Sequence, residues 1–126
     1  MKIKVSEATP RQLDCMVAKA EGATGVRLHT YRGINPGPAV WVVDWEREPE
    51  AHHWVELSSL DYSTDWAQGG PIIERARLLL RPYGLSWECS MGGVNWLKGP
   101  TPLIAAMRCY VASKLGDEVE IPEELQ

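Results

Sequence analysis

The stretch LSWECSMGGVNWL, residues Leu85–Leu97, decides the fold class because it has the pattern of a β-hairpin. Apolar and polar side chains alternate up to Met91, which is the two-residue period of a half-buried strand. Gly92-Gly93 then supplies a tight two-residue turn between two strands. Such a turn sets the register and puts apolar residues of both arms on one face. The expected partners are Met91 with Val94 and Cys89 with Trp96.

The sequence predicts a helix on each side of this hairpin, over residues 71–80 and 102–115. Each begins with a cap residue followed by a proline, whose missing N–H is not needed in the first helical turn. The two signals are Gly70-Pro71 and Thr101-Pro102. We expect Pro82 to end the first helix and Gly116 the second.

A third helix is predicted over residues 10–21, where the start signal is the most complete. Thr9 can cap the first turn, Pro10 takes the first helical position, and Gln12 completes a capping box. Apolar residues then recur at helical spacing and form one face. These are Leu13, Met16, Val17 and Ala20, and Gly22 ends the helix.

Alternating or β-rich segments predict short strands over residues 2–5, 26–31, 39–45 and 53–57. A turn is expected at Asn35–Pro38, a charged loop over 46–50, and an irregular segment over 58–70. Short strand connections favour antiparallel pairing. The order therefore predicts an α+β fold, with a small antiparallel or mixed sheet and about three helices packed on it.

The length and charge fit one domain with an acidic tail. The chain has 126 residues and a net charge of -4, and five of its 17 acids lie in residues 117–126. We expect one domain over 1–116 and a tail over 117–126 that adds little stability. Residues 1–116 hold 12 acids against 13 Lys and Arg, and no run of bases. This pattern disfavours direct DNA binding.

The cysteines and the apolar segments disfavour a disulfide-rich, secreted or membrane-spanning protein. Cys15, Cys89 and Cys109 are odd in number and widely spaced, which fits buried free thiols better than disulfides or a metal site. The opening MKIKVSEATP lacks the apolar core of a signal peptide, and no apolar run approaches the ~20 residues that span a bilayer. Nothing in the sequence indicates a cofactor or a membrane partner. A homo-oligomer is compatible with the sequence.

Two stretches resemble a known family. They are YSTDWAQGGPIIER, residues Tyr62–Arg75, and GPTPLIAAMRCYVASKLGDEV, residues Gly99–Val119. Together with Met1–Gly22 they resemble NinX proteins, small accessory proteins of lambdoid phages and prophages, whereas residues 23–57 and 76–98 resemble the family less. The resemblance implies a protein made in the host bacterial cytoplasm and dispensable for building the virion. The family is a domain of unknown function, so no catalytic residue can be carried over.

The best candidate site is the loop from Asp61 to Gly70. Its rings could stack on a base, and a helix starting at Gly70-Pro71 would offer free N–H groups to an anion. Arg75, one turn into that helix, could face the same ligand. The alternative is an irregular loop whose polar groups cap its own turns. The predicted ligand-binding residues are Tyr62, Ser63, Thr64, Asp65, Trp66, Gln68, Gly69, Gly70, Arg75 and, at a second helix start, Thr101.

Other chemistries have weaker signals. His52 and Glu56 would share a face only on a helix, whereas this segment is expected to be extended. The adjacent pair His52 and His53 has no third ligand at metal-binding spacing, so we predict no metal site. Asp61 and Asp65 could act as an acid–base pair only if they converge. At the start of the helix predicted over residues 102–115, the simpler interpretation is that Thr101 only caps the helix.

Three functions remain. The first is a non-enzymatic phage protein that captures a small anionic, nucleotide-like ligand and so counters host defence, by analogy with other small phage proteins. The second is a protein–protein inhibitor of a host factor, with the acidic tail on a basic surface. The third is a small nucleotide hydrolase that uses Asp61, Asp65 or His53.

Overall fold

The computed structural model describes residues 1–30, 39–47 and 51–125, and in these it has three helices and three small antiparallel sheets. The α+β fold is therefore confirmed. The turn expected at residues 35–38 lies outside the described residues. The helices are α1 (Pro10–Ala20), α2 (Trp66–Ala76) and α3 (Pro102–Leu115), and the 3-10 turns are η1 (Val5–Glu7) and η2 (Leu57–Ser59). The strands are β1 (Lys2–Lys4), β2 (Gly25–Thr30), β3 (Ala39–Arg47), β4 (Ala51–Glu56), β5 (Leu79–Tyr83), β6 (Ser86–Met91), β7 (Val94–Gly99) and β8 (Glu118–Glu120).

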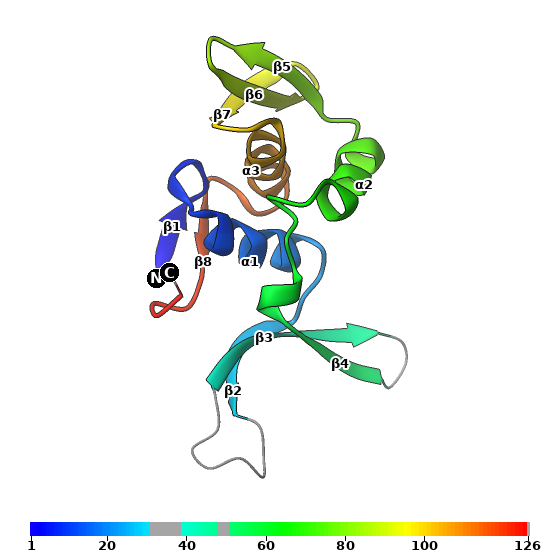
Figure 1. Ribbon diagram of the computed structural model, residues 1–126, viewed down its shortest axis with the longest axis vertical. Helices are drawn as coiled ribbons and strands as arrows, with labels where there is room; N and C mark the ends of the chain where they lie inside the picture. The colour runs from blue at the N-terminus through cyan, green and yellow to red at the C-terminus, as the bar shows by residue number, and fades with distance from the viewer. Residues whose placement is uncertain (31–38, 48–50, 126) are drawn as a thin grey trace.

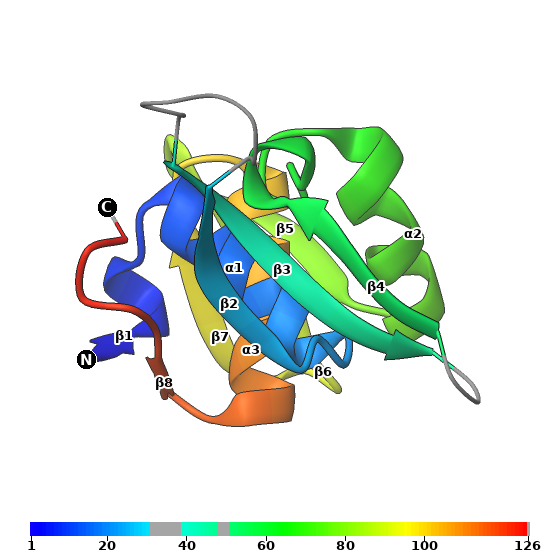
Figure 2. The ribbon, with the colours of Figure 1, turned by 90° about the horizontal axis from the view of Figure 1, so that it is seen from below.

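The elements stack in tiers (Figure 1). The sheet β2-β3-β4 lies at one end with α1 across it, α3 packs on α1, and the sheet β5-β6-β7 covers α3 at the other end. Figure 2, seen from below, shows α1 and α3 behind β2-β3-β4, with α2 on one flank and β1-β8 on the other. The core lies between the sheets, where α1 and α3 contribute most of the fully buried side chains.

Helices α1 and α3 begin where the sequence predicts. The Gln12 N–H donates to Thr9 Oγ1 at 3.3 Å and the Thr9 N–H donates to Gln12 Oε1 at 3.0 Å, which completes the capping box. At α3 the Ile104 N–H donates to Thr101 Oγ1 at 3.1 Å. These local bonds satisfy N–H groups that the first helical turn leaves without a partner.

The boundaries predicted for α2 are wrong at both ends. The helix begins at Trp66, because Asp65 caps it by accepting from the Ala67 N–H at 2.9 Å, and Pro71 lies inside it. It ends at Ala76, followed by Arg77 in the left-handed conformation. The Leu78 N–H donates to Ile73 O at 3.1 Å, a bond typical of a helix C-terminus. Leu79 and Leu80 therefore belong to β5, where Pro82 fits because β5 is an edge strand.

The hairpin has the predicted turn but a different register beyond it. Gly92 and Gly93 both have positive φ, as a tight I′ turn requires, and Met91 pairs with Val94. Cys89 pairs with Leu97 and not with Trp96, because an extra residue bulges from β7 near Asn95, which has a φ of 54°. The bulge moves Trp96 out of the expected pair.

The acidic segment after Gly116 docks on the body of the protein. Strand β8 pairs antiparallel with β1, and Val119 faces Ile3 across the pair. The Ile121 N–H donates to Met1 O at 3.0 Å. The acids face solvent, but every second or fourth side chain is apolar and enters the core: Val119, Ile121 and Leu125 are buried.

Candidate functional site

The side-chain amide of Gln68 binds the backbone of the loop that was predicted to bind a ligand. Gln68 Oε1 accepts from the Asp61 N–H at 2.8 Å, and Gln68 Nε2 donates to Ser59 O at 3.1 Å. The Asp65 N–H also donates to Asp61 O at 2.7 Å. Both polar ends of the Gln68 side chain therefore serve the loop itself, as the alternative interpretation of this segment expects.

Ser63 and Asp65 have structural partners as well. Ser63 is buried, its Oγ donates to Pro10 O at 3.2 Å, and its N–H donates to Asp14 Oδ1 at 2.8 Å. Asp65 caps α2 through the Ala67 N–H. These bonds tie the loop to the start of α1 and fix the start of α2.

Gly69 and Gly70 do not form the predicted anion-binding helix start. Both lie within the first half of α2, and the Gly69 N–H donates to Asp65 O at 2.9 Å. Gly69 is buried where a Cβ would lie 2.3 Å from Tyr62 O and 2.6 Å from Leu103 Cδ1. The glycine is thus needed for close packing of α2 on the loop and on α3.

Arg75 and Thr101 lie outside the loop cluster. Arg75 Nη2 donates to both carboxylate oxygens of Glu21 at 2.9 and 2.8 Å, and to the Tyr110 hydroxyl at 3.3 Å. Thr101 caps α3. The structure therefore does not bring these two residues together with the loop.

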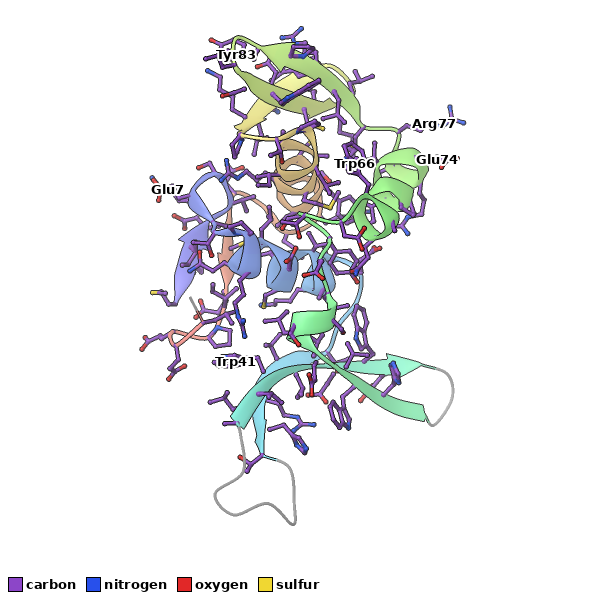
Figure 3. All side chains as sticks on the ribbon, viewed as in Figure 1. Glu7, Trp41, Trp66, Glu74, Arg77 and Tyr83 are labelled. Carbon is purple, nitrogen blue, oxygen red and sulfur yellow. The ribbon has the colours of Figure 1, made fainter. Side chains whose placement is uncertain are left out.

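Thr64, in the loop, and Trp66, the first residue of α2, are the exposed residues among the predicted site residues of 62–70. Thr64 is exposed, Tyr62 is half-buried, and 54% of Trp66 is exposed. Its ring lies along α2, with Cε3 at 3.8 Å from the position of a Cβ on Gly70 (Figure 3). The indole is therefore accessible to a ring that stacks on it.

A cleft of about 280 Å³ opens between the start of α1 and the segment 57–64. It brings two carboxylates, Asp14 and Asp61, together with the cation of Arg11 and two hydroxyls. Sequence reasoning had paired Asp61 with Asp65, but its neighbour in the cleft is Asp14. The lining residues are Pro10, Arg11, Asp14, Leu57, Ser58, Leu60, Asp61 and Thr64.

The proton affinity of Asp14 is changed by this position. Burial raises the pKa of Asp14 to about 6, and the negative charge of Asp61 adds to the rise. Hydrogen bonds from Ser63 favour the charged carboxylate and therefore act to lower the pKa. A carboxylic acid with a raised pKa in a cleft marks a functional-site candidate.

Sequence reasoning missed Asp14 and Arg11. Asp14 stands between Leu13 and Cys15, two fully buried residues, and is itself buried. A carboxylate on the buried side of an amphipathic helix was the available signal, because such a group needs a hydrogen-bonding partner. Arg11 carried no comparable signal.

The cysteines and histidines form no metal-binding cluster among the described residues. Cys15, Cys89 and Cys109 are free and buried as predicted, and burial raises the pKa of the Cys15 thiol to about 11. No three His, Cys, Asp or Glu side chains of the described part converge as metal ligands, and the side chain of His52 lies outside that part. Of the helices described, none is long and apolar enough to cross a bilayer.

The comparisons with known proteins give a family without an activity. The family model described as Bacteriophage P22, NinX matches residues 4–114. This range contains α1, α2, nearly all of α3 and every residue of the cleft, whereas β8 lies beyond it. None of the curated proteins compared with the chain matches it.

Proposed function

Because this chain belongs to the bacteriophage P22 NinX family, we propose that it is a phage accessory protein that captures a small nucleotide-like ligand without transforming it. The site proposed for capture is the cleft between α1 and residues 57–64. The loop chosen from the sequence contributes Asp61 and Thr64 to it, and α1 contributes Arg11 and Asp14.

The observation that carries the proposal is one cation beside two carboxylates in a cleft. Arginine is suited to a phosphate, and a carboxylate beside a nucleotide commonly accepts hydrogen bonds from the ribose hydroxyls. Leu57 and Leu60 supply an apolar wall. The volume of about 280 Å³ lies near the lower end of small-molecule sites, which favours a mononucleotide or part of one.

The exposed indole of Trp66 is the second element of the proposal. It follows Thr64, a cleft residue, by two positions. A base that extends beyond the cleft could stack on it. Stacking is sequence-tolerant and typically adds ~1–3 kcal/mol per base.

Isothermal titration with a panel of mononucleotides tests this function. We expect Arg11→Ala to weaken binding about tenfold or more, since hydrogen bonds to charged groups are worth ~1.5–3 kcal/mol. Lys114→Ala removes an exposed cation from the last turn of α3 and is the matched control. Trp66→Ala should weaken binding of the nucleotide more than binding of ribose phosphate. If no nucleotide binds, or if Arg11→Ala and Lys114→Ala behave alike, the proposal is wrong.

The raised pKa of Asp14 favours one second candidate, a small nucleotide hydrolase. Asp14 would hold a proton near pH 6 and Asp61 would act as the base. Incubating the pure protein with each nucleotide that binds, followed by product analysis, separates the two. Turnover that Asp14→Asn abolishes would favour the hydrolase over simple capture.

A further inference from the structure

The sheet β5-β6-β7 has one face on α3 and a second face that carries rings and cations. Cys89 and Leu80 pair across β5 and β6 and belong to the core, so their face is the inner one. Strand residues that alternate with them point to the opposite side. We call this side the outer face, and its residues are Leu79, Arg81, Tyr83, Ser86, Glu88, Ser90, Lys98 and, after the bulge, Trp96.

Two cations on the outer face each lie over an aromatic ring. The Arg81 guanidinium lies 3.7 Å from the centroid of Trp96, and Lys98 Nζ lies 4.0 Å from the centroid of Tyr83. Each pair joins β5 to β7 across β6. The rings attract the cations electrostatically and hold them at fixed places on the sheet.

A buried acid lies beneath these pairs. Glu88 is in register with both cations, with Arg81 on one side and Lys98 on the other. Its carboxylate accepts from Arg81 Nε at 2.5 Å, and its side chain is 5% exposed. Glu88 therefore neutralises Arg81 and leaves the charge of Lys98 to set the sign of the outer face, which is positive in a protein of net charge -4.

The outer face combines the aromatic rings and the positive charge that bind a single-stranded nucleic acid. Its exposed side chains are Arg81, Tyr83, Lys98 and one aliphatic residue, Leu79, and the Trp96 indole is half-buried, whereas Glu88 and Ser90 are buried. Antiparallel sheets that display aromatic side chains bind single strands by stacking bases on the rings, and arginine planes stack in the same way. The absence of a basic run in the sequence disfavoured nucleic acid, but the fold places Arg81 and Lys98 on one face although they are 17 positions apart.

We propose that the outer face of β5-β6-β7 binds single-stranded nucleic acid, with bases stacked on Tyr83 and on the Arg81–Trp96 pair and a phosphate on Lys98. Figure 3 shows Tyr83 at the far end of this sheet, away from α1. The cleft at α1 takes no part in it, so the two sites can succeed or fail separately. Duplexes fit poorly, because their bases are already stacked on each other.

The test is fluorescence anisotropy of labelled oligo(dT) and oligo(rU) of about 12 nucleotides, a length within the usual footprint of such surfaces. Binding of the single strand should be tighter than binding of a duplex of the same length. Because about one phosphate contact is expected, the slope of log K against log salt should be near -0.7. Preference for oligo(rU) over oligo(dT) or the reverse identifies the source of the strand.

Matched variants decide whether the rings carry the binding. Tyr83→Leu keeps apolar area but removes the ring, and we expect roughly tenfold weaker binding, whereas Tyr83→Phe should bind as the parent does. Lys98→Ala should flatten the salt dependence, and Lys114→Ala, which changes an exposed cation of α3, should change nothing. Melting curves of the variants check that they remain folded, as expected at Tyr83 because half of its surface is exposed. Equal binding by Tyr83→Leu and Tyr83→Phe, or equal competition by a poly-glutamate peptide, would overturn the proposal.

Discussion

Gly69 is the residue on which the packing of α2 most directly depends. A Cβ at this position would lie 2.3 Å from Tyr62 O, a backbone atom that cannot give way easily. At the neighbouring Gly70, the nearest atom to a Cβ is Trp66 Cε3 at 3.8 Å, an ordinary contact. Close packing therefore requires a glycine at position 69 but not at position 70.

Alanine at each of these positions should shift stability in opposite directions. Gly69→Ala should destabilise the protein by ~1–3 kcal/mol, the usual cost of overpacking a buried site. Gly70→Ala should stabilise it by ~0.5–1 kcal/mol, because alanine loses less backbone entropy in a helix. Urea unfolding of the two variants measures both effects. Equal changes in the two would contradict the packing described for α2.

Asp14 predicts a pH dependence of stability. Burial raises its pKa to about 6 from an ordinary value of 3.8, so the folded state holds this proton more tightly than the unfolded chain. The contribution to stability is present below pH ~4 and is lost as the pH rises through ~6, by at most ~3 kcal/mol. Asp14→Asn removes the ionisation, and its amide oxygen can still accept from the Ser63 N–H.

We therefore expect Asp14→Asn to gain stability relative to the parent between pH 4 and pH 7. Chemical unfolding at the two pH values measures the difference, and the other carboxylates cancel because both proteins contain them. Parallel pH profiles of the two proteins would show that Asp14 ionises normally in the fold.

At the scale of elements, the sequence predicts those helix starts that depend on hydrogen bonds between near neighbours in the chain. The starts of α1 and α3 follow from bonds between residues three positions apart, and the sequence contains both partners. The predicted start of α2 is wrong because Gly69-Gly70-Pro71 has the composition of a helix break. In the fold, close contacts with Tyr62 and Leu103 require a glycine at position 69 inside the helix. The register beyond Met91 was wrong because a bulge has no fixed sequence signature.

The docked segment after Gly116 gives the clearest prediction at this scale. Truncation after Val119 removes Ile121 and Leu125, which are 2% and 1% exposed. Full burial of such side chains is worth ~1.5–3 kcal/mol each, so the melting temperature should fall by about 10 °C or more. A control with Glu123→Gln and Glu124→Gln changes only exposed acids and should melt as the parent does. A truncated protein that melts within ~4 °C of the parent would show that the segment adds little.

At the scale of the whole molecule, the tiered stack assembles sites from distant parts of the chain. Asp14 and Asp61 share a cleft although 47 positions separate them. The sequence located one wall of this cleft, the loop with Asp61 and Thr64, because loop composition is visible locally. It could not locate Arg11 and Asp14, since pairing α1 with that loop depends on tertiary bonds such as Ser63 N–H to Asp14. Most of the other predicted site residues stabilise the loop and the helix starts.

Capture of a nucleotide-like ligand in the α1 cleft is tested by identifying the small molecules that the protein carries from the cell. The protein is expressed in bacteria, purified without heating and mildly denatured, and the released small molecules are measured by absorbance at 260 nm and mass spectrometry. We predict a phosphorylated, nucleotide-like compound that is released by the parent and by Lys114→Ala but is strongly depleted in Arg11→Ala. Release of no such compound from the folded parent, or equal amounts from Arg11→Ala and the parent, would contradict the claim.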